Sequence, residues 1–191
     1  MCAWRALGAM MSALSSIAAE IDSTRDVSAD TSQYEPLTPP SLGTLRPLGA
    51  RIASIHGGIR RPLRKAVLVM AGDHGVTREG VSPYRGDLTR QVVLNMLHGR
   101  AAINAVARSV GARVEVVDMG IERPLEDVAV NEVLLRRHRL GAGTCNIVHG
   151  PAMDRRVVVA GIEAGIEVVS AIARSGCTLL GVGEMGIGNT T

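Results

Sequence analysis

The sequence has very few aromatic residues. It contains no Phe, one Trp and two Tyr among 191 residues, although 46% of its residues are hydrophobic. A chain of this length and hydrophobicity can bury a substantial core in one domain, and that core must be built from aliphatic side chains. Because aromatic side chains for base stacking are scarce and the net charge is only +3, the composition argues against nucleic acid as a partner.

Cysteine and lysine are scarce too. Cys2, Cys145 and Cys177 are odd in number and too widely spaced for a zinc site, so no metal is expected. This cysteine usage fits a reducing compartment and predicts a cytoplasmic protein. Lys65 is the only lysine, and we interpret the basic run at residues 136–139 as a solvated face.

Long hydrophobic runs are also missing. None approaches the ~18 consecutive apolar residues of a membrane-spanning helix, so no membrane association is expected. Residues 1–19 faintly resemble a signal peptide, but Arg5 and several serines interrupt their apolar run. We favour a short amphipathic helix for this stretch.

The sequence suggests a division near residue 36. Residues 1–36 are expected to form an N-terminal helix, at about 8–22, followed by a polar linker, and residues 37–191 to form the main domain. After a Pro-Pro turn, apolar residues spaced along one face between residues 45 and 55 predict a helix. A glycine pair at 57–58 is expected to end that helix.

From residue 65 onward, strand patterns alternate with helix patterns. This alternation predicts an α/β protein with a largely parallel sheet. The expected strands are 66–71, 114–118, 133–135 and 177–183, and the expected helices are 88–109 and 152–175, the latter with a possible break near Gly161 or Gly165.

The first long helix carries a regular apolar stripe. Asp87 is the expected N-cap and Gly111 the expected stop of this helix. The stripe predicted to be buried contains Leu88, Val92, Met96, Gly99, Ile103, Val106 and Val110.

The stretch after the last expected strand carries the strongest functional signal. A strand followed by a Gly-rich turn with hydroxyl side chains is how α/β proteins build phosphate sites. Glu184, at the strand end, is the best candidate for acid–base chemistry. Gly186 and Gly188 would let the backbone approach an anion, and Asn189, Thr190 and Thr191 would add side-chain donors.

Two other strand ends carry acidic residues. Asp73, His74 and Gly75 follow the first strand, and Asp118 ends the second. Ligands bind beyond the carboxyl ends of parallel strands, so we expect one site along that edge. Two interpretations of Asp73 stay open: a turn in which its carboxylate accepts backbone N–H groups, or a direct site role.

The candidate residues outside the strand ends are less specific. Ser82 follows a turn but lacks a His–Asp arrangement that would make it a nucleophile. Gln91 could hydrogen-bond a heterocycle or be a surface residue. Met153 and Met185 could form a soft wall for an aromatic ring, although a core role is favoured for Met153.

Taken together and in order, several motifs resemble the nicotinate-nucleotide–dimethylbenzimidazole phosphoribosyltransferase family. The resemblance covers about residues 37–191 and ends on Gly-Glu-Met-Gly-Ile-Gly-Asn-Thr-Thr. Its blocks are residues 65–70, 73–76, 79–82, 99–104, 117–121, 143–147, 150–153 and 183–191.

The resemblance implies a Rossmann-like three-layer fold with a small N-terminal helical subdomain, and a homodimer. It implies transfer of phosphoribosyl from nicotinate mononucleotide to 5,6-dimethylbenzimidazole, which gives α-ribazole 5′-phosphate and nicotinate. No metal or other cofactor is implied, since the leaving pyridinium is already cationic. The incoming azole must lose its N–H proton, so a general base helps.

Carried over by position, residues 184–191 would line the nucleotide, with Met185 beside its base. Ser82 and Gln91 would lie by the benzimidazole pocket, and Asp73 and His74 at the adjoining strand end.

The sequence departs from the family pattern in three places. The Pro-Pro turn at residues 38–43 is shortened, and Arg85 and Arg100 stand where smaller residues are common. The family's principal catalytic Glu lies in a later segment of a longer chain. We therefore expect Glu184 to be auxiliary and this chain alone to be inactive or nearly so. The alternative is a non-catalytic fragment that binds a nucleotide or assembles with another subunit.

Overall fold

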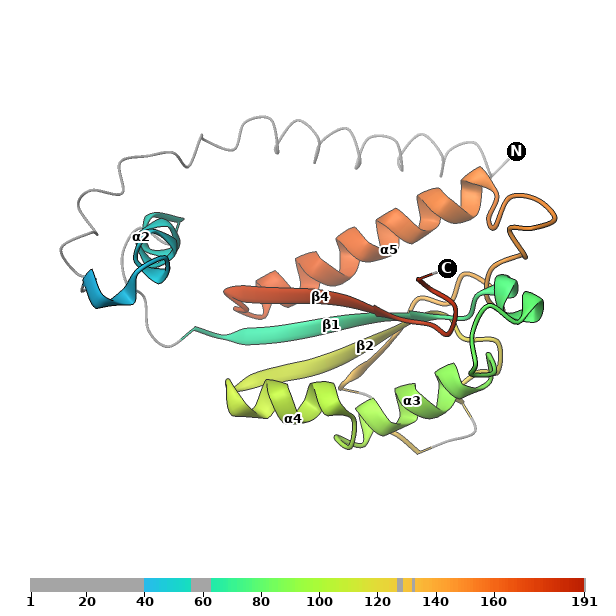
Figure 1. The fold of residues 1–191 in the computed structure, drawn as a ribbon, viewed down its shortest axis with the longest axis horizontal. Helices are drawn as coiled ribbons and strands as arrows, with labels where there is room; N and C mark the ends of the chain where they lie inside the picture. The colour runs from blue at the N-terminus through green and yellow to red at the C-terminus, as the bar shows by residue number, and fades with distance from the viewer. Residues whose placement is uncertain (1–39, 56–62, 127–128, 132, 191) are drawn as a thin grey trace. The chain divides into compact units, whose positions relative to one another are not determined.

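The structure is a computed structural model (Figure 1). It describes residues 40–55, 63–126, 129–131 and 133–190. The helix expected near the N-terminus, the linker that follows it, the glycine pair at 57–58 and Thr191 lie outside the described residues. The chain divides into two compact units, Met1–Leu63 and Arg64–Thr191, which are described separately.

The first unit contains the helix that was expected after the Pro-Pro turn. A short 3-10 helix, η2 (Pro40–Leu42), precedes α2 (Leu45–Ile55), which confirms that prediction. Ala50 and Ala53 are buried. The large apolar side chains of the predicted face are exposed, namely Leu45, Leu48 and Ile52.

The second unit is built around a parallel sheet, as predicted. Its strand order is β3-β2-β1-β4, and all three pairings are parallel. The strands are β1 (Lys65–Gly72), β2 (Ala112–Gly120), β3 (Leu135–Arg137) and β4 (Leu179–Met185). β3 and β4 each begin two residues later than expected, whereas β1 and β2 contain the predicted strands entirely.

Helices cover both faces of this sheet, which confirms the three-layer α/β fold (Figure 1). On one face lies α5 (Arg155–Arg174), whose Val168 and Ile172 pack against Leu68 of β1. On the other face lie α3 (Leu88–Leu97) and α4 (Ala102–Ser109). A single-turn 3-10 helix, η3 (Gly75–Glu79), follows β1.

The single helix predicted over residues 88–109 is wrong. Gly99, with φ of +73°, separates α3 from α4. Asn104 holds the break, because its Oδ1 accepts a hydrogen bond from the N–H of Ala101 at 3.1 Å and its Nδ2 donates to the carbonyl of Met96 at 3.0 Å.

Because the break changes the helix direction, one periodicity cannot run through both helices, and the predicted stripe is only partly correct. Met96 and Ile103 pack against the core, partly buried. Val106 and Val110 are 62% and 51% exposed, whereas the buried residues of the two helices are Thr89, Val93, Leu94, Leu97, Asn104 and Ala107.

The predicted ends of these helices are partly correct. Asp87 stands at the N-cap of α3, but its side chain makes no capping hydrogen bond within the described residues. Gly111 follows α4 with φ of +66°, as expected for a glycine stop. α5 runs unbroken through both of its glycines, and Gly161 lets the helix approach Leu140 closely, since a Cβ there would lie 3.3 Å from Leu140 Cδ1.

The basic run at residues 136–139 is not simply a solvated face. Arg136 Nε donates to Glu115 Oε2 at 2.7 Å, and Arg113 Nε donates to Glu115 Oε1 at 2.6 Å. The Glu115 side chain is only 3% exposed, so two arginines neutralise a buried carboxylate. Arg139 donates to the carbonyls of Ile121 and Glu122. These contacts fix the short strand β3 and the loop after it to β2.

Within the part of the chain that the structure describes, no helix combines the length and apolarity that crossing a membrane requires.

Candidate active site

The carboxyl ends of three strands meet at one edge of the sheet, as their sequence predicted. In the register, Met70 of β1 lies beside Glu184 of β4, and Gly72 lies beside Gly120 of β2. The backbones stay joined beyond the strands, since the N–H of Asp73 donates to the carbonyl of Gly120 at 3.0 Å. Asp73 and Glu184 line one cavity there, whereas the buried Asp118 accepts from the N–H groups of Gly120 and Ile121 through Oδ1.

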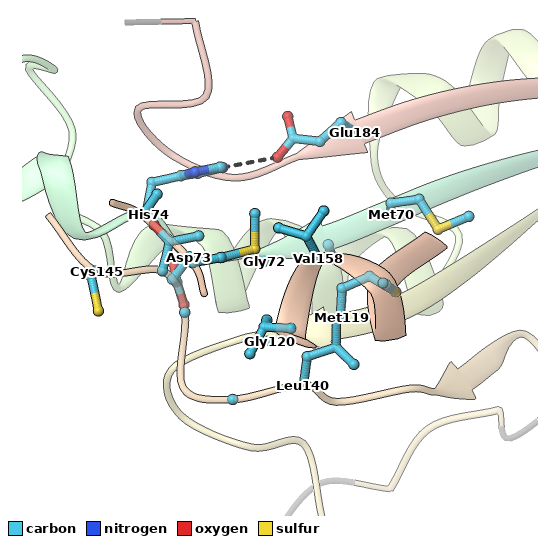
Figure 2. A pocket seen from close by; sticks show the side chains of 18 of the residues that line it. Met70, Gly72, Asp73, His74, Met119, Gly120, Leu140, Cys145, Val158 and Glu184 are labelled. Atoms are coloured by element: carbon cyan, nitrogen blue, oxygen red, sulfur yellow. Dashed lines mark hydrogen bonds and ion pairs between the residues drawn. The ribbon is translucent and has the colours of Figure 1, made fainter. Parts of the chain in front are cut away.

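Glu184 and His74 form the central polar contact of this edge. His74 Nε2 lies 3.2 Å from Glu184 Oε1, as Figure 2 shows. Asn189 Nδ2 donates to the other carboxylate oxygen, Oε2. The Glu184 side chain is 41% exposed, so it is oriented by two neighbours while it stays open to a ligand. Each carboxylate oxygen has a second lone pair that a ligand can use.

Asp73 takes part in two ways. Its Oδ2 accepts a hydrogen bond from the N–H of Glu122 at 2.7 Å, so the carboxylate does accept a backbone N–H, but from the loop after β2 and not from its own turn. Its Oδ1 is buried and has no hydrogen-bond partner among the described residues. Asp73 also lines the cavity described below. The contact with Glu122 therefore fixes one oxygen, and the other is buried beside the cavity.

A cavity of about 550 Å³ opens at this edge, on the α5 side of the sheet (Figure 2). Its walls are mostly apolar and come from the ends of β1 and β2, the loop at 140–154 and the first turns of α5. Glu184, His74 and Asp73 lie among its polar residues. The large apolar residues of its wall are Met70, Met119, Leu140, Met153, Val157, Val158 and Ile162.

Apart from Met153, the loop at 140–154 that lines the cavity was not predicted as part of the site. Thr144 donates its N–H to the carbonyl of Asp73 at 2.9 Å. Gly143, with φ of +86°, also lies close to Asp73: a Cβ on Gly143 would be 2.9 Å from the carbonyl oxygen of Asp73. Asp154 caps α5, because its Oδ1 accepts from the N–H of Val157 at 2.9 Å. The glycines in this loop were a usable signal for a close backbone approach.

Met153 corrects another prediction. The core role favoured for it is wrong, because Met153 is 43% exposed and lines the cavity, in agreement with the alternative of a soft wall. A methionine in a polar loop has no periodicity from which its burial can be inferred, so only the fold could place it.

The turn after β4 folds back toward α3. The N–H of Ile187 donates to Thr89 Oγ1 at 3.0 Å, and the N–H of Asn189 donates to the carbonyl of Gly186 at 3.1 Å. Gly188 adopts φ of +86°, which only glycine takes at no cost. Residues 186–190 therefore form a tight turn beside Glu184, and two of its amides are already paired.

Among the described residues, the cavity is lined by Asp73, His74 and Glu184 but by no other predicted site residue, neither those of the turn at 186–190 nor Ser82, Gln91 and Met185. The Ser82 hydroxyl accepts from the N–H of Tyr84 at 3.1 Å, and Gln91 Nε2 lies 3.5 Å from Asn95 Oδ1 on the exposed side of α3. Met185 packs against the core clusters on the α3 and α4 face. It points away from Glu184, because neighbouring residues of a strand face opposite sides of the sheet. The substrate-contact roles of all three stay predictions.

Within the described ranges, no group of three or more His, Cys, Asp or Glu side chains offers ligands for a metal ion.

Comparisons with known proteins agree with the fold and the motifs. A family model described as a phosphoribosyltransferase matches residues 19–191. The nicotinate-nucleotide–dimethylbenzimidazole phosphoribosyltransferase of a Roseiflexus species is 45% identical over 186 residues, which are 95% of this chain and 52% of that protein. The Geobacter sulfurreducens protein of the same name is 44% identical over 152 residues, 79% of this chain and 42% of that protein.

Solved structures give the same picture. A crystal structure of the phosphoribosyltransferase of that name from Thermus thermophilus superposes with a TM-score of 0.76 at 39% identity, over 87% of this chain and 50% of that one. A crystal structure of CobT from the same organism gives a TM-score of 0.72 at 41% identity. The chain thus spans about half the length of the relatives it matches.

Proposed function

This chain belongs to the nicotinate-nucleotide–dimethylbenzimidazole phosphoribosyltransferase family, and on that premise we propose that its strand-end site serves phosphoribosyl transfer from nicotinate mononucleotide to 5,6-dimethylbenzimidazole. In this reaction the bond between the ribose C1′ and the pyridinium nitrogen breaks, and its electron pair leaves on neutral nicotinate. A bond forms between C1′ and the azole nitrogen, and the azole N–H proton passes to a base. The product is α-ribazole 5′-phosphate.

The observation that carries the proposal is the Glu184 carboxylate at the rim of an apolar cavity, oriented by His74 and Asn189. When the pyridinium leaves, positive charge develops at C1′ and its ring oxygen. A carboxylate held in advance at that point stabilises this charge without reorganising. Glu184 acts as this electrostatic group and as an auxiliary proton acceptor.

The cavity suits the aromatic part of a substrate. Its volume of about 550 Å³ falls in the usual range for small-molecule sites, and its walls are apolar with a few polar groups at one end. A flat ring would lie against Met153 and Val158, with its polar edge toward Glu184.

We assign the phosphate to the turn at 186–191. Since the amides of Ile187 and Asn189 are already paired, the phosphate contacts would come from the other amides of the turn and from the hydroxyls of Thr190 and Thr191. His74, next to both the turn and the cavity, would help to hold the ribose. Ser82, Gln91 and Met185 would contact substrate from the α3 side of the sheet edge, outside the cavity.

The remaining parts of the proposal concern context. Residues 37–191 would belong to the catalytic α/β domain, with the N-terminal helix and linker before it. We propose a cytoplasmic homodimer that uses no cofactor. The 191-residue chain alone would turn over poorly, because half of the length of its relatives has no counterpart in it.

The test is a calorimetric titration of the purified chain. Nicotinate mononucleotide should bind and NAD should bind at least about tenfold more weakly. Glu184→Gln should weaken binding of the cationic nucleotide several-fold, since it removes the charge and keeps the shape. Glu126→Gln, which changes a 62% exposed carboxylate paired loosely with Arg137, is the matched control.

Equal affinity for the two nucleotides, or equal affinity of Glu184→Gln and the unchanged chain, would contradict the proposed site. Rapid formation of α-ribazole phosphate by the chain alone would contradict its predicted low turnover.

A further inference from the structure

Glu79 and Asn146 belong to two of the motif blocks described above, yet neither lines the cavity within the part of the chain that the structure describes. Glu79 is the last residue of η3, and Asn146 lies in the loop between β3 and α5. Their side chains meet although they are 67 positions apart in the sequence. The contact lies directly beside Thr144 and Cys145, which do line the cavity.

This contact is a short hydrogen bond to a charged acceptor. Asn146 Nδ2 donates to Glu79 Oε1 at 2.6 Å, and Asn146 Oδ1 accepts from the N–H of Val148 at 3.1 Å. Because the amide oxygen is engaged by a donor, the amide nitrogen is the atom that faces the carboxylate. His149 Nε2 lies 3.6 Å from the same Glu79 oxygen, but its side chain is 74% exposed, so this contact adds little. The hydrogen bond to Asn146 is therefore the stronger of the two.

The loop around Asn146 also packs tightly against the start of η3. The N–H of Gly75 donates to Thr144 Oγ1 at 3.2 Å. A Cβ on Gly75 would be 2.6 Å from the carbonyl oxygen of Thr144 and 2.7 Å from the backbone nitrogen of Asn146, so the two backbones are in direct contact. The N–H of Cys145 donates to the carbonyl of Ala152 at 2.8 Å, which joins the two ends of the loop. A shift of Asn146 would therefore move both ends.

Both ends of this loop form part of the cavity wall. Thr144 and Cys145 line the cavity from one end, and Ala152 and Met153 line it from the other. The place proposed above for a flat ring, against Met153, therefore depends on where the loop lies. Glu79 can hold the loop from outside, because it does not itself line the cavity.

We propose that Glu79 is a positioning residue. Through its hydrogen bond to Asn146, it holds the cavity wall at residues 144–145 and 152–153 in the place that an aromatic ring requires. The effect on ring binding rests on the function proposed above, whereas the restraint on the loop does not. Glu79 takes no part in the bonds that form and break at C1′.

The test exchanges the donor and the acceptor of this hydrogen bond. Asn146→Asp keeps the oxygen that accepts from Val148 but replaces the donor with a second carboxylate, which repels Glu79. Adding Glu79→Gln supplies an amide donor from the other side and restores the hydrogen bond. A general loss of packing at Asn146 would not be repaired in this way. Glu126→Gln, at a carboxylate that is 62% exposed, is the matched control.

Hydrogen exchange without any ligand measures the restraint itself. The N–H groups of Thr144 and Cys145 are both hydrogen-bonded, at 2.9 and 2.8 Å. Their exchange should become about threefold to tenfold faster in Asn146→Asp, as expected when one hydrogen bond is lost, and return to the original rate in the double variant. The amides of β1 should exchange equally in all variants.

Calorimetric titration with 5,6-dimethylbenzimidazole measures the consequence for the cavity. The affinity should fall about threefold to tenfold in Asn146→Asp and recover in the double variant. The control should match the unchanged chain in both measurements. If the unchanged chain binds no dimethylbenzimidazole, the proposed function fails, and the exchange measurement still decides whether Glu79 restrains the loop.

Unchanged exchange in Asn146→Asp, or faster exchange that the double variant does not repair, would overturn the proposal. So would an unchanged affinity in a variant whose loop exchanges faster, since the restraint would then have no bearing on the cavity. Urea unfolding shows whether each variant folds. If Asn146→Asp alone does not fold, a double variant that folds supports the proposal, and a double variant that also fails to fold overturns it.

Discussion

Gly186→Ala tests the packing that holds the candidate site together. Gly186 is buried directly after β4. A Cβ there would lie 2.2 Å from the carbonyl oxygen of Gly72 and 2.6 Å from Nε2 of His74. An ordinary contact needs at least 3.4 Å, so the backbone must move apart by about 3.4 − 2.2 = 1.2 Å. The imidazole can rotate away, but the carbonyl belongs to the central strand β1 and cannot.

Overpacking of this kind costs about 1–3 kcal/mol of unfolding free energy. For a chain of this size that corresponds to a fall of about 2–12 °C in the melting temperature. The same displacement pulls His74 away from Glu184, so binding of nicotinate mononucleotide should weaken along with stability. Urea unfolding and calorimetric titration measure the two effects.

Two controls separate the clash from the general effect of replacing glycine. Gly165→Ala lies in the middle of α5 with open space around it, so it should stabilise the protein by about 1 kcal/mol. In Gly183→Ala, on β4 itself, the Cβ meets nothing closer than 3.9 Å and should be tolerated. If Gly186→Ala unfolds at the same urea concentration as the unchanged chain, the close approach of Gly186 to β1 is refuted.

Three further predictions follow from local contacts. Asp154→Ala removes the capping hydrogen bond of α5 and should cost about 0.5–2 kcal/mol in urea unfolding, whereas Asp87→Ala, at a cap position with no such bond, should cost less; equal costs would contradict the capping role. Glu115→Gln leaves two arginines without their shared carboxylate and should cost about 1–3 kcal/mol, against less than about 0.5 kcal/mol for the exposed Glu126→Gln. Val158→Phe puts a ring into the cavity and should abolish binding of the aromatic substrate without lowering the melting temperature; unchanged binding would place the ring elsewhere.

The strands that form the middle of the sheet could be predicted because their signal is local and continuous. β1 is a continuous apolar run and β2 is rich in valine, and short runs of this kind bounded by turn residues are typical of strands buried on both faces. β3 was harder to place, because its position depends on Arg136, which reaches the buried Glu115 on the neighbouring strand. Glu115 is distant from Arg136 in the sequence. The sequence alone therefore cannot distinguish an arginine that pairs with a buried carboxylate from an arginine that faces solvent.

The break between α3 and α4 shows the same limit within a helix pattern. The apolar spacing continues across Gly99, so it favours one helix. The break is stabilised by Asn104, whose two hydrogen bonds require a folded-back chain. Alternation along β4, in contrast, is a rule that the sequence already contains: Glu184 and Met185 are adjacent on a strand and cannot both face the cavity.

By itself, the sequence determined the parallel α/β architecture and the edge at which Asp73, His74 and Glu184 gather, because strand ends follow from local hydrophobic runs and parallel strands end on the same side. Only the tertiary structure decided that Glu184 is oriented by His74 and Asn189, and that a loop near residue 144 and the first turns of α5 close an apolar cavity beside it. Except for the contact between Asn189 and Glu184, which are five residues apart, these contacts join residues that are far apart along the chain. They therefore depend on how the layers pack.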